Sequence, residues 1–169
     1  MTRLSLVVLA ALLIVGCGSS SSPSSPSSNN ITFTAQLSPG NETPPVTNAE
    51  SSASGTASIV FVPTKDSAGN ITSAVGTATV TMQGFPVGST ITLAHIHTGA
   101  AGTPGAVFIG FVPSASVPAT NGSATFSQTA NVTGDQLTSL MNNPSGFYFN
   151  VHTLLNPGGV MRGQLVRGQ

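Results

Sequence analysis

The sequence predicts an all-β fold, an antiparallel Greek-key-like sandwich or barrel with one short helix. Apolar and polar residues alternate with a period of two in several segments, as they do in strands with one buried face. Glycine and proline are frequent, with 19 and 12 residues, and many lie between these segments, where they predict turns. Only one segment shows helical spacing, so strands do not alternate with helices as a parallel sheet requires.

The clearest alternation lies in the segment 31–38, ITFTAQLS, in which Phe33, Ala35 and Leu37 fall on one face. This pattern predicts a strand with one buried face. A loop rich in proline and glycine follows over 39–48. Similar reasoning predicts further strands at residues 54–62, 71–84, 90–98, 106–112, 122–132, 146–153 and 158–166.

Two of these strands carry additional information. The strand at 54–62 is expected to end at Pro63, because a proline cannot donate a hydrogen bond to a sheet ladder. The run AVFIGFV at 106–112 is apolar throughout, which indicates a strand that is buried on both faces or lies at a sheet edge.

The single helix is predicted over residues 134–142. Thr133 precedes it and Gln136 follows three residues later, which is a capping-box pattern. Apolar residues then recur at helical spacing until Pro144 ends the run. The helix is therefore expected to make about two turns.

The N-terminal segment, MTRLSLVVLAALLIVGC, predicts a secretory signal over residues 1–16. Its apolar run is shorter than the roughly 20 residues that span a bilayer. The run ends in a motif that resembles a bacterial lipobox, with Gly16 before Cys17, so we expect Cys17 to be lipidated after cleavage. The alternative is a signal-anchor with an incidental cysteine. Cys17 is the only cysteine, so no internal disulfide can form.

The segment 17–30 predicts a tether, because serine and proline dominate it and it contains no apolar residue beyond Cys17. The chain is thus expected to divide into a signal peptide (1–16), a tether (17–30) and one domain (31–169). We expect a lipoprotein of the bacterial cell envelope, anchored to a membrane through its N-terminal lipid and exposed to the periplasm or the exterior.

The charge content excludes one class of partner. Four basic and four acidic residues balance, and charged residues make up 5% of the chain. Nucleic-acid binding needs clusters of lysine and arginine, and this sequence has none. The sequence does not identify a protein or small-molecule partner.

The three histidines are the candidate metal ligands. His95 and His97 lie two residues apart in a predicted strand, so their side chains share a face. His152 lies in another predicted strand, which as an antiparallel neighbour would bring it beside the pair. We expect the three imidazoles to lie together inside the two-layered body. Three neutral imidazoles suit copper or zinc. The alternative is a structural role, in which each ring donates to a backbone carbonyl.

Other catalytic patterns are absent from the sequence. No serine lies in a G-x-S-x-G motif, and no pair of carboxylates lies in a predicted strand. The glycine-rich stretch GAAGTPG at 99–105 lacks the lysine of a phosphate-binding loop, so it predicts a tight connection after the histidine strand.

Several motifs resemble those of the CHRD domain, a module first described in chordin and found in many bacterial secreted proteins. The resemblance covers residues 31–167 and includes an early L-x-G-x-x-E-x-P-P-V pattern from Leu37 to Val46. The later motifs are AHIHTG, GAVFI, YFNVHT and PGGVMRGQL, at residues 94–99, 105–109, 148–153 and 157–165. The resemblance implies a β-rich extracellular domain whose biochemical role is mostly undefined.

Glu42 and Arg162 both fall in these motifs. The simplest interpretation is an ion pair that clamps the first and last strands, because a buried guanidinium needs partners. The alternative role for Arg162 is to steer an anion.

A fainter resemblance is to copper-zinc superoxide dismutases, which are Greek-key sandwiches. They have an H-x-H strand, a later V-H and a C-terminal glycine-rich segment with an arginine near the copper. His95, His97, His152 and Arg162 occur here in the same order. Nothing in this chain matches the bridging histidine, the zinc ligands or the disulfide of that family.

Two functions follow from these observations. The first is a lipid-anchored cell-envelope module with a structural or binding role and no catalysis. The second is a copper-binding, superoxide-dismutase-like redox protein that uses His95, His97 and His152. Copper is the only cofactor that either interpretation requires.

Overall fold

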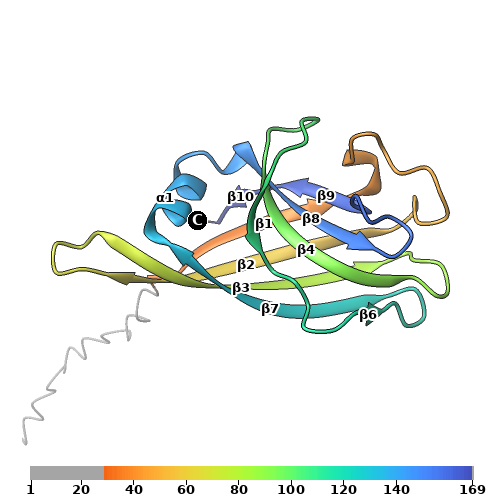
Figure 1. Cartoon of the computed structure of the whole chain (residues 1–169), viewed down its shortest axis with the longest axis horizontal. Coiled ribbons are helices and arrows are strands. Elements are labelled where there is room, and N and C mark those ends of the chain that lie inside the picture. The colour runs from red at the N-terminus through yellow and green to blue at the C-terminus, as the bar shows by residue number, and fades with distance from the viewer. Residues whose placement is uncertain (1–28, 169) are drawn as a thin grey trace, which may run out of the picture.

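The computed structural model describes residues 29–168 as two antiparallel sheets packed face to face (Figure 1). The predicted all-β sandwich with one short helix is confirmed. The first sheet contains, in spatial order, β10 (Val166–Arg167), β1 (Ile31–Leu37), β2 (Ser54–Lys65), β3 (Ile71–Gln83) and β7 (Ala124–Thr133). The second contains β5 (Val107–Gly110), β4 (Thr90–Thr98), β8 (Phe147–Thr153) and β9 (Met161–Gln164), and β6 (Val117–Pro118) pairs with β4.

The core fills the space between the two sheets. Alternate residues of each strand point into it, because successive side chains of a strand face opposite sides. Phe33 and Phe61 meet edge to face with ring centroids 5.9 Å apart, and Phe111 and Phe149 pack at 6.1 Å. All four rings are fully buried, and burial of such large apolar side chains is the main stabilising term of the sandwich.

The helix α1 (Gly134–Asn142) links the first sheet to the second and matches its predicted bounds. Its capping box is formed: the Thr133 hydroxyl accepts from the Gln136 amide, and the Gln136 side chain accepts from the Thr133 amide. The Gln136 side-chain amide also donates to the Phe108 carbonyl, which ties the helix to β5. Short 3-10 turns, η1 (Pro39–Asn41) and η2 (Pro144–Gly146), follow β1 and α1.

The predicted end of a strand at Pro63 is wrong, since β2 continues to Lys65. Pro63 remains paired with Ala74 of β3 on one side. On the other side β1 begins at Ile31, opposite Phe61, so β2 has no partner there beyond Phe61. A proline is tolerated where its nitrogen faces such an open edge.

The predicted strand at 158–166 is in fact two short strands in different sheets. β9 pairs with β8 in the second sheet, and β10 pairs with β1 in the first. The buried Leu165 lies between them. Ser38 and Arg162 also exchange backbone hydrogen bonds of 3.2 and 3.3 Å. The C-terminal segment therefore joins both sheets.

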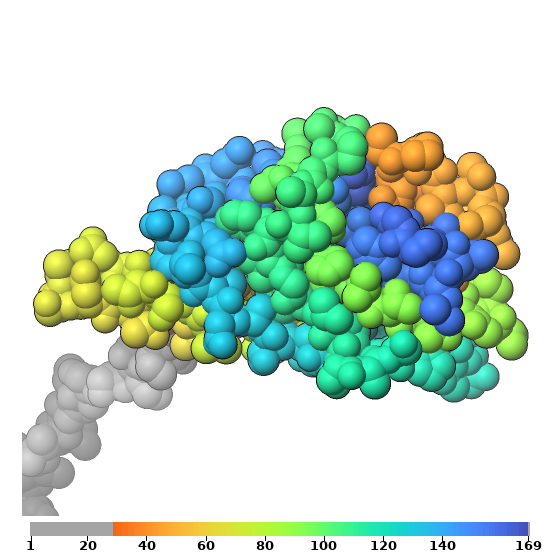
Figure 2. Space-filling view, in the orientation of Figure 1, coloured from red at the N-terminus to blue at the C-terminus, as the bar shows by residue number. Residues whose placement is uncertain are grey.

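Two loops cover the outer face of the second sheet. Figure 2 shows the segment after β1, in orange, next to the blue segment between β8 and β9. Asn48 and Asn156 join them, with 2.8 Å between the side-chain amide nitrogen of Asn48 and the oxygen of Asn156. β5 is the edge strand of this sheet, which confirms the edge interpretation of the run at 106–112. β4 and β8 are thus interior strands beneath loops.

No helix among residues 29–168 is both long and apolar enough to span a membrane. The predicted signal peptide, the lipidated Cys17 and most of the tether lie outside the described residues.

Gly163 lies in the C-terminal segment that joins the two sheets, and a larger residue there should destabilise the fold. A Cβ atom at Gly163 would overlap the backbone carbonyl of Gln36 in β1. We expect Gly163→Ala to lower the free energy of unfolding by about 2–4 kcal/mol, because backbone cannot move aside as a flexible side chain does. Urea denaturation measures the change. Gly158→Ala is the matched control, since a Cβ there meets nothing within 4 Å. Equal stability of the two variants would contradict the prediction.

Candidate metal centre

The histidines lie on the outer face of the second sheet. In β4, Ala94 and Ile96 belong to the core, so His95 and His97 point away from it. His152 points outward from β8, because its neighbour Val151 is a core residue. The three rings therefore lie together, as expected, but beneath the covering loops and not between the two sheets.

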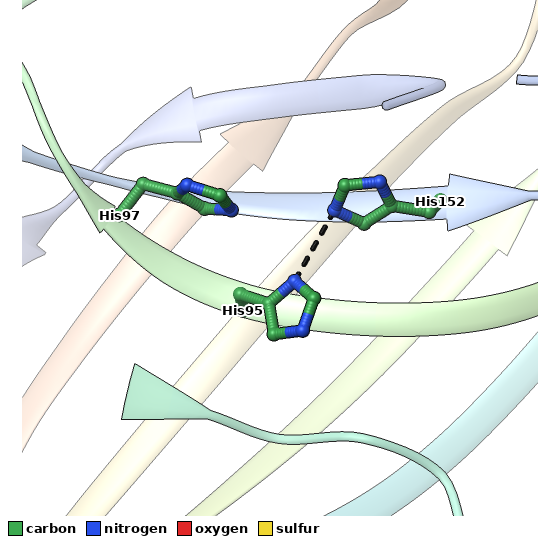
Figure 3. A group of neighbouring side chains, drawn as sticks. All are labelled: His95, His97 and His152. Carbon is green, nitrogen blue, oxygen red and sulfur yellow. Dashed lines mark hydrogen bonds between the residues drawn. The ribbon is translucent and has the colours of Figure 1, made fainter. Parts of the chain in front are cut away.

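The register of β4 and β8 brings the three rings together. His95 pairs with Asn150, and Leu93 pairs with His152, so His152 approaches His95 diagonally on the same face. The Nδ1 atom of His95 lies 3.2 Å from the Nε2 atom of His152. One nitrogen from each of the three rings lies within 4.8 Å of the others, and Figure 3 shows the His97 ring pointing toward this pair.

Backbone carbonyls fix the orientation of two of the rings. The Nδ1 atom of His97 lies 3.0 Å from the Gly105 carbonyl, and that of His152 lies 2.9 Å from the Pro157 carbonyl. A carbonyl only accepts hydrogen bonds, so both Nδ1 atoms carry the proton and both Nε2 atoms present a lone pair. His95 must then donate from Nδ1 to the Nε2 atom of His152.

One of these lone pairs has no partner. The Nε2 atom of His97 is buried and makes no hydrogen bond in the part of the chain that the structure describes. Buried polar atoms are almost always satisfied, and an exception needs a physical reason. This lone pair lies beside the facing nitrogens of His95 and His152.

The His95 and His152 rings are neutral at neutral pH. The pKa of His95 is lowered to about 4, mainly by burial and further by the neighbouring His152 and His97. Burial also lowers the pKa of His152, against the opposing effect of its bond to Pro157. Neutral imidazole is the form that ligates metals, so the site needs little deprotonation before it binds an ion.

Tyr148 packs directly against His97. The two rings are parallel within 6°, with centroids 5.1 Å apart. The Tyr148 hydroxyl accepts a hydrogen bond from the Gly105 amide, 3.2 Å away, so it also holds the loop whose carbonyl orients His97. Gly105 has to be a glycine, because a Cβ there would overlap the backbone of Thr98. The predicted tight connection at 99–105 is thus part of the histidine site.

Arg162 lies on Tyr148 and is held by the loop after β1. Its guanidinium carbon is 4.7 Å from the Tyr148 ring centroid. Its Nε atom donates to the Asn41 carbonyl at 2.6 Å, and its Nη2 atom donates to the Thr43 hydroxyl. Glu42 Oε2 is 3.9 Å from the Arg162 Nε atom. Arg162 is 3% exposed, so its charge faces these loop groups and not an open path for anions.

The Glu42 carboxyl is only partly satisfied. Burial raises its pKa to about 7, although Arg162 opposes that change. Its Oε1 atom and the Oδ1 atom of Asn150 are both buried without a hydrogen-bond partner among the described residues. Both oxygens lie 2.9 Å from the point where a Gly159 Cβ would sit. A proton on Glu42 removes one of these unsatisfied acceptors.

A second buried carboxylate anchors the other covering loop. Glu50 accepts hydrogen bonds from Ser89, Thr153 and Asn156, each at 2.6 Å. Asn156 precedes Pro157, whose carbonyl orients His152. Glu50 therefore positions the histidine site without contacting a ring nitrogen.

Tyr148 and Asn150 are parts of the site that were not predicted from the sequence. The signal was available, because residues 148, 150 and 152 alternate along one strand and so share the face of His152. The carbonyl acceptors of Gly105 and Pro157 have no side-chain signature and could not be found in this way.

Comparison with known proteins identifies one family. The family model described as the CHRD domain matches residues 33–165. No curated protein and no solved structure matches the chain.

Glu42 predicts a distinctive pH dependence of stability. Its pKa is raised from 4.5 to about 7, so its favourable contribution to folding is complete below pH 4.5 and is lost as the pH rises to 7. We expect Glu42→Gln, relative to the wild type, to gain about 1–3 kcal/mol of stability between pH 4.5 and 8. Urea denaturation across this range measures the difference.

Asp135→Asn is the control for this comparison, since it removes a carboxyl from the exposed face of α1. The histidines contribute equally to all three proteins and cancel in the differences. A difference between Glu42→Gln and the wild type that does not vary with pH would contradict the prediction.

Proposed function

The chain belongs to the CHRD domain family, and we propose that it is a binding module whose ligand is a copper ion held by His95, His97 and His152. The observation that carries this proposal is the unpartnered Nε2 atom of His97, buried beside the two other ring nitrogens. An ion at this point would give the lone pair a partner and would replace the His95–His152 hydrogen bond.

The spacing of the nitrogens requires only a small adjustment. Imidazole nitrogens bind zinc at about 2.0–2.1 Å, so two ligands of one ion of this size lie no more than roughly 4 Å apart. One nitrogen from each ring lies within 4.8 Å of the other two, and the His95 and His152 nitrogens are already 3.2 Å apart. His95 is the least buried of the three rings.

The surroundings resemble those of known metal ligands in one respect. A ligating histidine usually donates its other N–H to a carbonyl or carboxylate, which fixes the ring and its tautomer. Gly105 and Pro157 supply such carbonyls to His97 and His152. The candidate ligand set contains only histidines, so the site offers no anionic ligand.

The ligand type favours copper. Imidazole suits copper and zinc, whereas Ca²⁺ and Mg²⁺ prefer oxygen ligands. A site built only of nitrogen ligands binds Cu²⁺ more tightly than the other divalent ions of the first transition series. Three protein ligands also leave a coordination position open. The proposal does not include anion steering by Arg162, because its donors are committed to the loop after β1.

A purely structural role is the second candidate. The hydrogen bond between His95 and His152 favours it, because this bond satisfies two of the three rings without an ion. In this case His97 would hold the connection at 99–105 through Gly105, and His152 would hold the loop between β8 and β9 through Pro157. The two functions differ in whether the wild-type protein takes up a metal.

We expect the purified protein to bind one copper ion per chain, and His97→Ala to lose stoichiometric binding. The expected loss is at least tenfold in affinity, because His97 would supply one of three ligands. Elemental mass spectrometry after exposure to one equivalent of copper or zinc measures the content. Thr79→Ala is the control, since Thr79 is exposed on the first sheet and should leave the content unchanged. Absence of both metals from the wild type would leave the structural role.

We also propose that Cys17 carries a lipid that holds the module at the bacterial cell envelope. The lipobox-like ending of the leader and the tether that follows support this proposal. Cys17→Ser is expected to release the protein from the membrane fraction or to leave it unprocessed. Fractionation and immunoblotting of cells measure both outcomes, with Ser20→Ala as the control. Unchanged processing and membrane association of Cys17→Ser would refute lipidation.

A further inference from the structure

Three side chains from neighbouring strands form a stack that ends at the histidine site. β8 lies between β4 and β9, so His97 of β4 and Arg162 of β9 approach Tyr148 from opposite sides. The Tyr148 ring lies 5.1 Å from the His97 ring and 4.7 Å from the Arg162 guanidinium carbon. Tyr148 and Arg162 are each 3% exposed. A positive charge is therefore held behind a proposed metal ligand, with an aromatic ring and no bulk water between them.

The charge of Arg162 is incompletely balanced. The nearest Glu42 oxygen is 3.9 Å from the Arg162 Nε atom. The other groups that Arg162 contacts, the Asn41 carbonyl and the Thr43 hydroxyl, are neutral. Because the pKa of Glu42 is raised to about 7, this carboxyl carries only part of a negative charge near neutral pH. Glu50, the other buried acidic residue, accepts hydrogen bonds from Ser89, Thr153 and Asn156 and is the same in every variant compared below.

We propose that Arg162, behind the Tyr148 ring, shifts the preference of the histidine site from Cu(II) toward Cu(I), and that Glu42 limits this shift. The inference rests on the proposed copper site. A nearby positive charge disfavours the more highly charged ion, and a nearby negative charge favours it. Tyr148 acts as a positioning residue, because it keeps water out of the space between the charge and the ligand.

The size of the effect follows from Coulomb's law. The guanidinium lies on the order of 10 Å from the His97 ring, and at an effective dielectric constant near 20 a unit charge at this distance is worth about 1.7 kcal/mol per unit of metal charge. This corresponds to a roughly tenfold change in the ratio of the Cu(II) to the Cu(I) dissociation constant. Glu42 is mostly ionised at pH 8, above its pKa of about 7, and its negative charge should have the opposite and smaller effect.

The test measures the two dissociation constants separately, by competition with Cu(I)- and Cu(II)-specific chelators at pH 8. We expect Arg162→Gln to lower the Cu(II)-to-Cu(I) ratio of dissociation constants roughly tenfold, and Glu42→Gln to raise it by roughly threefold. Arg162→Lys keeps the charge and should stay close to the wild-type ratio.

The opposite signs separate charge from structure. Both variants break the same ion pair, so a loosened loop would move the ratio in the same direction in both. Shifts of equal sign, or an unchanged ratio in both, would overturn the proposal. If Arg162→Gln does not fold, Glu42→Gln decides alone, because its amide matches the carboxyl in size and can donate to the unpartnered oxygen of Asn150. A fall or no change in its ratio would then overturn the proposal.

Failure of the proposed copper site would be seen in the wild type. If the unmodified protein binds neither copper ion, the proposed function and this inference both fall. If it binds copper but the ratio of dissociation constants is the same in Arg162→Gln and Glu42→Gln as in the wild type, only the inference is wrong.

Discussion

The antiparallel pairing of β4 with β8 is the constraint on which the candidate site depends. It sets His95 opposite Asn150 and His97 opposite Tyr148, and it leaves His152 one step along the same face. A shift of β4 by one residue in this register would turn His95 and His97 into the core. The apolar residues between them, Ala94 and Ile96 in β4, prevent that shift, because their burial stabilises only one register. Packing of the sandwich thus specifies the positions of the polar site.

The covering loops are held by a few buried charges in a chain that has very few charges. Arg162 binds the loop after β1, and Glu50 binds the loop between β8 and β9. Removing one partner of a buried charge is costly because the other is left unpaired. The loops in turn supply the Pro157 carbonyl and shield the Tyr148 and His152 side chains from solvent. The buried charged residues Glu42, Glu50 and Arg162 therefore hold the loops that cover the outer face of the sheet.

Much of the fold could be predicted from the sequence because local patterns determine it. Alternation identified the strands, and the Thr133–Gln136 capping box fixed the start of the helix. The division of the last predicted strand into β9 and β10 could not be predicted, because the change of sheet at Leu165 depends on the position of β1. The end of β2 was wrongly predicted at Pro63 for the same reason, since the lack of a neighbouring strand on that side of β2 depends on where β1 begins.

The candidate site was only half visible in the sequence. The three histidines could be found from their type, their number and the two-residue spacing. Their position outside the core could not, because a half-polar strand pattern does not say which loops cover its polar face. The acceptors that orient His97 and His152 are main-chain oxygens, for which no residue type is diagnostic. Tyr148 could have been found, because it lies four residues before His152 in one strand and so shares its face.

The change of sheet at Leu165 has a consequence for the order in which the protein assembles. β10 completes the edge of the first sheet and β9 that of the second, so neither sheet has its final edge until residues 161–167 are present. The pairing of β10 with β1 and the hydrogen bond from Arg162 to Asn41 join residues more than 120 positions apart, and such distant contacts form late and slowly. During synthesis, the segments that contain the histidines leave the ribosome before the strand that clamps their covering loop. The loops that surround the three imidazoles are consequently among the last parts of the molecule to fold.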